Sequence, residues 1–170
     1  MVGVSKPSAH LIVVEGKPLV DERIVETATN MIPGRLCTKG TASQQIIVCT
    51  ATLFPMGWIG FEHTSARFRP ADIATAHAAN DVASVLYGGH FVVQGVLTIS
   101  QTIVDGDILV PAAAGNLQKG TVLVATSGAS TTPLAITGNY PGSGMPIARA
   151  RESVTTDGST YSRISVLSLI

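Results

Sequence analysis

The residues best suited to catalysis stand together near the middle of the chain, at Glu62, His63, Thr64 and Ser65. They supply an acid, a base and two hydroxyl groups, which are the components of a hydrolytic relay. Neighbouring residues of a strand point to opposite faces of its sheet, so an adjacent acid and base do not face one another. The sequence also lacks the Gly-x-Ser-x-Gly pattern of an exposed nucleophile. We therefore interpret this segment as structural and predict no catalytic residues and no enzyme.

The four histidines do not form a metal-binding pattern. His10, His63, His77 and His90 are scattered, and none stands at helical i, i+4 or His-x-His spacing with another ligand. The glycine-rich sequences that hold phosphates, Gly-x-x-x-x-Gly-Lys-Ser/Thr and Gly-x-Gly-x-x-Gly, are also missing. We predict histidines in solvent or at interfaces, with no metal and no cofactor.

The two cysteines allow two interpretations. Cys37 and Cys49 are equally distant from Ser43, so a hairpin centred there would set them opposite each other. Opposed residues of antiparallel strands are close to disulfide distance. Folding in a reducing cytoplasm instead favours two small buried thiols.

Four arginines form two Arg-x-Arg pairs, Arg67 with Arg69 and Arg149 with Arg151. Residues i and i+2 of a strand share one face, so each pair could present two guanidinium groups to a carboxylate-bearing surface. The alternatives are exposed charge that solubilises the chain and contact with another subunit or a capsid.

Large apolar side chains are concentrated in residues 53–61, which include Phe54, Met56, Trp58 and Phe61. Only 5% of the chain is aromatic, so this clustering is notable. In a strand and turn such residues form core, but Trp, Phe and Met are also enriched in subunit interfaces. Both interpretations remain open.

The composition favours a protein that associates with others. Charged residues make up 13% of the chain, against about 25% in an average domain. Eleven basic residues balance eleven acidic ones, so no positive field for nucleic acid is visible. No apolar run approaches the length of a membrane span, and no signal peptide is indicated, so we expect folding in a cytoplasm.

The chain is expected to be mainly β. Strands are predicted at residues 46–52, 82–86, 91–98, 108–110, 121–126 and 164–170, which are rich in Val, Ile and Thr. Seventeen glycines and nine prolines punctuate them, as in a small sandwich or barrel built of short hairpins. At most one short helix is expected, at residues 71–79, where alanine is dense.

The two ends of the predicted domain differ from its middle. Residues 1–30 are interpreted as an extended N-terminal arm, in which Leu11, Ile12, Val13 and Val14 could add a strand to a partner's sheet. Residues 31–170 form the β-rich domain. Within it, residues 127–146 are small, polar and rich in Gly and Pro, which predicts a long surface loop.

The second half of the chain resembles the head decoration proteins of tailed viruses, also called capsid cement proteins. The resemblance rests on residues 101–117, with the turn Asp105-Gly106-Asp107-Ile108-Leu109, and on residues 78–89. Residues 146–155 and 164–170 are similar to that family's last hairpin strand and final strand, although Pro146 replaces the usual Gly.

This resemblance implies a structural virion protein, homotrimeric, on the outer surface of the capsid. Such a protein clamps neighbouring major capsid subunits, and it binds neither nucleic acid nor membrane. The alternative is a carbohydrate- or receptor-binding β module of a virion spike or fibre, using the loop around Tyr140. Glycan sites usually present several exposed aromatic residues, and this loop offers Tyr140 alone.

Overall fold

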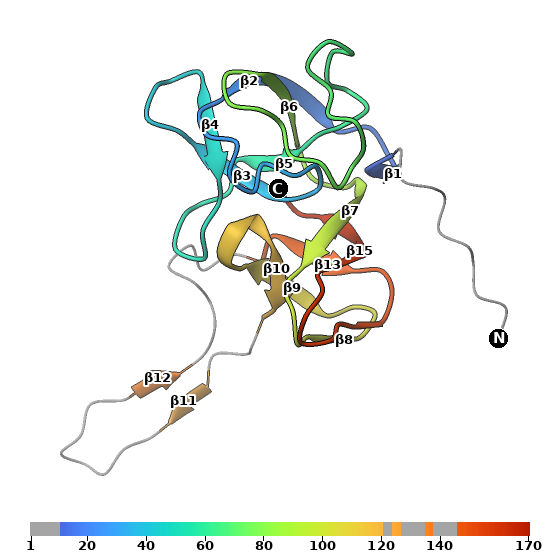
Figure 1. The fold of residues 1–170 in the computed structure, drawn as a ribbon. Helices are drawn as coiled ribbons and strands as arrows, with labels where there is room; N and C mark the ends of the chain where they lie inside the picture. Colours follow the sequence, from blue (N-terminus) through green and yellow to red (C-terminus); the bar gives the residue numbers. More distant parts are fainter. Residues whose placement is uncertain (1–10, 121–123, 127–134, 138–145) are drawn as a thin grey trace, which may run out of the picture.

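The computed structural model describes residues 11–120, 124–126, 135–137 and 146–170, and it confirms the mainly β prediction (Figure 1). The strands are β1 (Val13–Glu15), β2 (Leu19–Val25), β3 (Leu36–Lys39), β4 (Gln45–Val48), β5 (Gly57–Ile59), β6 (Val82–Tyr87), β7 (Val92–Leu97), β8 (Thr102–Ile103), β9 (Ile108–Pro111), β10 (Leu117–Lys119), β11 (Val124–Thr126), β12 (Ala135–Thr137), β13 (Ala148–Ala150), β14 (Val154–Thr155) and β15 (Ser162–Ser168). Two short pairs, β8 with β14 and β11 with β12, stand outside the main sheets.

The first half of the chain forms a closed barrel, in the order β2-β4-β3-β5-β6. Strands β2 and β6 pair antiparallel over their whole lengths, from Leu19 opposite Tyr87 to Ile24 opposite Val82. The barrel interior holds alanine and β-branched side chains together with one methionine and one thiol: Val25, Met31, Cys37, Ile46, Ile59, Ala83 and Val85. Closure leaves this half without free sheet edges, and edges are where sheets aggregate.

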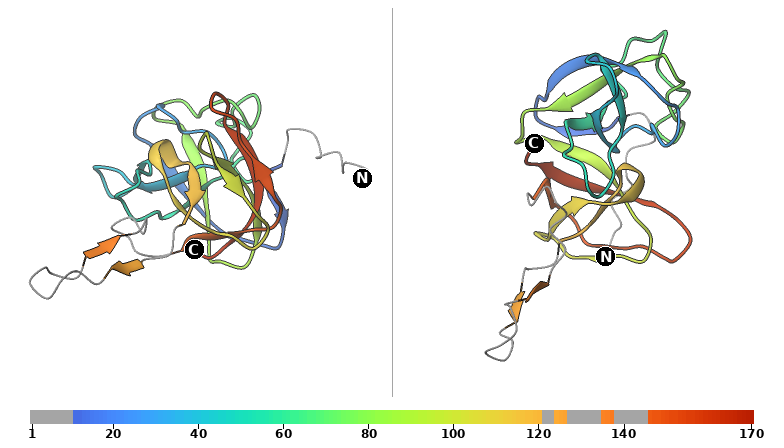
Figure 2. Two further views of the ribbon diagram at one scale, coloured as in Figure 1. Left: turned by 90° about the horizontal axis from the view of Figure 1, so that it is seen from below. Right: turned by 90° about the vertical axis from the view of Figure 1, so that its left-hand side faces the viewer.

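The second half forms another ring. Strand β7 pairs with β10, and the order continues through β9 and β13 to β15, which pairs back onto β7. We call this ring the second barrel and the preceding one the first barrel. Figure 1 and the right-hand view of Figure 2 show the first barrel above the second.

One shared core joins the barrels. Leu36, Trp58 and Leu86 lie on the outward face of β3, β5 and β6, and all three are fully buried. They belong to the same apolar cluster as Leu97 and Leu117 of the second barrel. These strands are therefore buried on both faces, one inside the first barrel and the other against the second.

The N-terminal arm prediction is wrong for residues 12–25. Ile12 is fully buried, and Val13 pairs with Val93 of β7. Residues 19–24 belong to a strand of the first barrel, β2, and pair with β6. The chain is thus folded into the domain well before residue 30, whereas residues 1–10 lie outside the described residues.

The helix expected at residues 71–79 is also not formed. Asp72 accepts hydrogen bonds from Ala74 N and Thr75 N, both at 2.8 Å, which fixes a turn instead. Aspartate side chains compete in this way with helical backbone bonding. Within the described ranges the only helical element is a short 3₁₀ turn at Ala113–Gly115. Most of the predicted loop at 127–146 lies outside these ranges, apart from β12 and Pro146.

Candidate functional site

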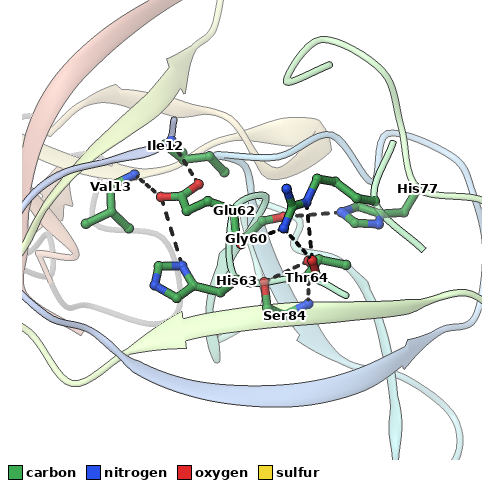
Figure 3. Close-up of polar contacts among 9 residues, drawn as sticks. Ile12, Val13, Gly60, Glu62, His63, Thr64, His77 and Ser84 are labelled. Carbon is green, nitrogen blue, oxygen red and sulfur yellow. Dashed lines mark hydrogen bonds and ion pairs between the residues drawn. The ribbon is translucent and has the colours of Figure 1, made fainter. Parts of the chain in front are cut away.

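The Glu62 segment anchors the N-terminal strand instead of forming a relay (Figure 3). The Glu62 carboxylate accepts hydrogen bonds from the backbone N–H groups of Ile12, at 3.0 Å, and Val13, at 2.7 Å. His63 Nδ1 lies 4.0 Å from Glu62 Oε1, at the limit of an ion pair. Both carboxylate oxygens of Glu62 accept a backbone hydrogen bond, so this side chain holds the chain in place at the start of β1.

The neighbouring polar groups are bonded to the fold in the same way. Thr64 Oγ1 and Ser84 Oγ are 2.8 Å apart, and both side chains are buried. His77 Nε2 is 3.2 Å from the carbonyl oxygen of Gly60, and burial lowers the pKa of this histidine. Arg69 donates to the carbonyl oxygens of Glu62 and Thr64, at 2.8 and 2.9 Å. The cluster ties residues 60–77 to β1 and β6.

Replacing Glu62 by glutamine is expected to loosen this anchor. The change keeps the shape but removes the charge and replaces one of the two acceptor oxygens by an NH2 group, so stability should fall by about 1–3 kcal/mol. Hydrogen exchange at the Ile12 and Val13 amides should accelerate. His63→Gln is the matched control, since the His63 side chain is not the acceptor for either amide. Unchanged protection of both amides in Glu62→Gln would refute the anchor.

The cysteines are two free, buried thiols, so the disulfide interpretation is wrong. The hairpin register places Cys37 opposite Val48 instead of Cys49. This one-residue offset turns the two side chains to opposite faces of the strands. Cys37 accordingly lies inside the first barrel and Cys49 in the shared core.

Both thiols are expected to be inert in the native protein. Burial raises the pKa of Cys37 to about 12 and that of Cys49 to about 11, and the thiolate is the reactive form. Native protein at pH 8 should react very slowly with Ellman's reagent, and protein in concentrated urea should titrate as two thiols. A native burst, or no thiol after unfolding, would contradict the assignment.

The buried thiols also make stability depend on pH. Their pKa values are higher in the folded protein than in the unfolded chain, so the unfolded chain loses its thiol protons first. The free energy of unfolding should therefore fall as the pH rises above about 9.

The first barrel carries a hollow beside exposed apolar side chains. The hollow, of about 200 Å³, is lined by Asp21, Arg23, Met56, Val85 and Tyr87. Leu19, the strand partner of Tyr87, is 59% exposed beside it. We define the barrel mouth as the lining residues Asp21, Arg23, Met56 and Tyr87, together with Leu19, which pairs with Tyr87, and Phe54, two residues before Met56.

The Phe54–Met56 segment is held in place along β3. Met56 N donates to the carbonyl oxygen of Cys37 at 2.8 Å, and the Thr38 hydroxyl donates to that of Phe54 at 2.7 Å. The Phe54 side chain is nevertheless 62% exposed. A rigid backbone therefore presents an aromatic ring and a thioether to solvent.

Charge at the barrel mouth is neutralised internally. Arg23 Nε donates to Asp21 Oδ2 at 2.7 Å, and Arg23 Nη1 donates to the carbonyl oxygen of Ser43 at 2.8 Å. The two charged side chains that line the hollow thus pair with each other, beside the apolar side chains of Met56 and Tyr87. Such a surface suits a protein contact better than recognition of a charged small molecule.

The structure divides the other residues predicted for an interface. Trp58 and Phe61 are buried, so the core interpretation holds for them, whereas Phe54 and Met56 are exposed. Arg67 and Arg69 lie outside any strand, with their guanidinium groups over the rings of Phe68 and Phe61, each at 5.5 Å. Arg149 and Arg151, on β13 and just after it, are exposed.

The predicted capsid-contact residues 11–14 are only partly available. Leu11 and Val14 are exposed, but Ile12 is buried and Val13 is half-buried. The Ile12 and Val13 N–H groups, which an added strand would need, already bond Glu62. The sequence did not identify Leu19, Asp21, Arg23 and Tyr87 as site residues. The first three alternate along β2, but the charged residues of this strand obscure its β pattern.

The comparisons with known proteins leave the family open. No protein-family model matches the chain, and no curated protein matches it. Among the described residues no three His, Cys, Asp or Glu side chains group as metal ligands. In the same residues, no helix is long and apolar enough to cross a membrane.

Proposed function

We propose that this protein is a structural virion protein that binds the outer surface of a capsid and stabilises the shell by clamping neighbouring major capsid subunits. The observation that carries the proposal is the barrel mouth, where exposed apolar side chains surround the paired Asp21 and Arg23 on a closed barrel. It includes Phe54, Met56 and Tyr87, and aromatic residues and Met are enriched at the centres of protein interfaces. The resemblance of residues 78–89 and 101–117 to capsid decoration proteins supplies the kind of partner.

The composition supports an associating protein. A chain with 13% charged residues and no net charge has little electrostatic repulsion to keep copies apart. On a capsid, several copies of a homotrimer can bind at once, and multivalency turns weak single contacts into lasting attachment. The protein would be made in the host cytoplasm and act at the outer capsid surface without a cofactor.

The proposal is tested by two measurements on the full chain. Size-exclusion chromatography with light scattering should give the mass of a trimer. Sedimentation with empty shells, assembled from the major capsid protein of the same genome, should carry the protein into the pellet. Shells already saturated with the protein serve as the control for trapping. A monomer that stays in the supernatant with unsaturated shells would overturn the proposal.

A further inference from the structure

A second cavity, of about 160 Å³, contains two arginines. Arg35, just before β3, and Arg163, on β15, line it together with Ile32, Ala74, Val96 and Tyr161. The residues come from both barrels and from the segment that joins β5 to β6. The cavity therefore combines two guanidinium groups with largely apolar walls.

Arg35 is buried without full hydrogen bonding. Its side chain is 3% exposed, and Nη1 donates to Asn30 Oδ1 at 2.8 Å. The Tyr161 ring lies 5.3 Å from the guanidinium carbon. Arg35 Nε has no hydrogen-bond partner in the part of the chain that the structure describes. A buried donor on a charged group is costly to leave without a hydrogen bond, so an acceptor atom is favoured beside Arg35 Nε.

Arg163 adds a second positive charge. It donates to the carbonyl oxygens of Ile73 and Gln94. Burial, together with the nearby Arg35, lowers the pKa of Arg163 to about 10, which still leaves it charged at neutral pH. Asp72 offsets part of this charge, but its Oδ1 is held by the Ala74–Thr75 turn, and Asp72 does not line the cavity.

We propose that this cavity binds the carboxylate of an acidic side chain presented by a partner protein. A guanidinium group matches a carboxylate with two parallel N–H···O bonds, and such charge-assisted bonds are strong. Ile32, Ala74 and Val96 would contact the methylene stem of the incoming side chain. Tyr161, 55% exposed over Arg35, is the wall most able to shift as the carboxylate enters.

The size of the cavity selects a side chain over a free metabolite. Small-molecule sites are usually about 300–1,000 Å³, and this one is about 160 Å³. A carboxylate on a short stem fits that space, and its backbone would remain outside. The inference concerns carboxylate chemistry and does not depend on the partner being a capsid.

Nuclear magnetic resonance of the full chain tests the proposal through the Arg Nε–Hε signals. N-acetyl-glutamic acid methylamide should shift the Arg35 and Arg163 signals saturably, and the glutamine analogue should not. Inorganic phosphate is the third probe, because it is negatively charged but lacks the planar pair of oxygens of a carboxylate. No shift with the glutamate derivative, or shifts with phosphate alone, would overturn the proposal.

A pair of variants at the cavity rim provides a test that leaves both arginines intact. Ala74 is exposed and lines the cavity, so Ala74→Glu should supply a carboxylate from within the chain. It should abolish the shifts caused by the glutamate derivative and raise the Tm by about 2–4 °C over Ala74→Gln. Equal Tm values and undiminished probe binding in both variants would contradict the carboxylate site.

Discussion

Replacing Trp58 by alanine is expected to lower the free energy of unfolding by about 3–5 kcal/mol, the largest stability effect of any single change considered for this chain. Trp58 is fully buried between the barrels, and its Nε1 donates to Ser168 Oγ at 3.0 Å. Gly95 of β7 makes room for it, since a Cβ there would lie 3.2 Å from the indole ring and 2.6 Å from Leu117. The truncation would leave a cavity where the two barrels meet and remove one hydrogen bond to Ser168 Oγ, which keeps its bond to the Ile170 carbonyl oxygen.

Urea unfolding followed by far-ultraviolet circular dichroism measures this loss. Phe54→Ala is the matched control, because it also removes an aromatic ring but from a side chain that is 62% exposed. Its effect should stay within about 0.5 kcal/mol, as for surface changes in general. Similar midpoints for Trp58→Ala and the unchanged protein would show that the barrels do not depend on this contact.

Introducing charge at the barrel mouth is expected to abolish attachment to the shell. In the double variant Phe54→Asp, Met56→Asp, two carboxylates replace exposed apolar side chains of the proposed contact. Loss of two central contacts and burial of unpaired charge should weaken binding by about a hundredfold or more. The fold should persist, because both side chains are exposed and their segment is held by backbone hydrogen bonds.

Co-sedimentation with empty shells over a range of protein concentrations gives the change in affinity. The double variant Ile99→Asp, Val104→Asp is the matched control: it places the same charges on exposed apolar residues between β7 and β9. This control should bind as the unchanged protein does. If both variants lose binding equally, the effect is one of net charge; if both bind normally, the barrel mouth is not the contact.

The most strongly patterned strands were predictable from the sequence. The 82–86, 91–98 and 108–110 predictions correspond closely to β6, β7 and β9. Strands β3 and β5 were not predicted. They are short and buried on both faces, so their residues do not alternate between apolar and polar. Asp21, Glu22 and Arg23 interrupt the apolar residues of β2, so its sequence predicts an extended arm and not a strand of the domain.

The candidate sites depended on tertiary structure that local patterns do not encode. Of the two interpretations of the cysteines, the buried thiols hold and the disulfide fails by one residue of register, since symmetry about Ser43 cannot distinguish facing residues from residues on opposite faces. Arg35 and Arg163 meet only because β3 and β15 belong to barrels that pack together. By contrast, the exposed Phe54 and Met56 were among the residues that composition alone had indicated for an interface.

Hydroxyl-radical footprinting of the protein on and off the shell tests most directly whether the barrel mouth faces a neighbour. Oxidation of Phe54, Met56 and Tyr87 should be high in dissociated protein and fall toward background in the assembled particle. Val104, exposed on the other barrel, should remain as reactive as before. Undiminished oxidation of all three mouth residues in particles that retain the protein would contradict the account.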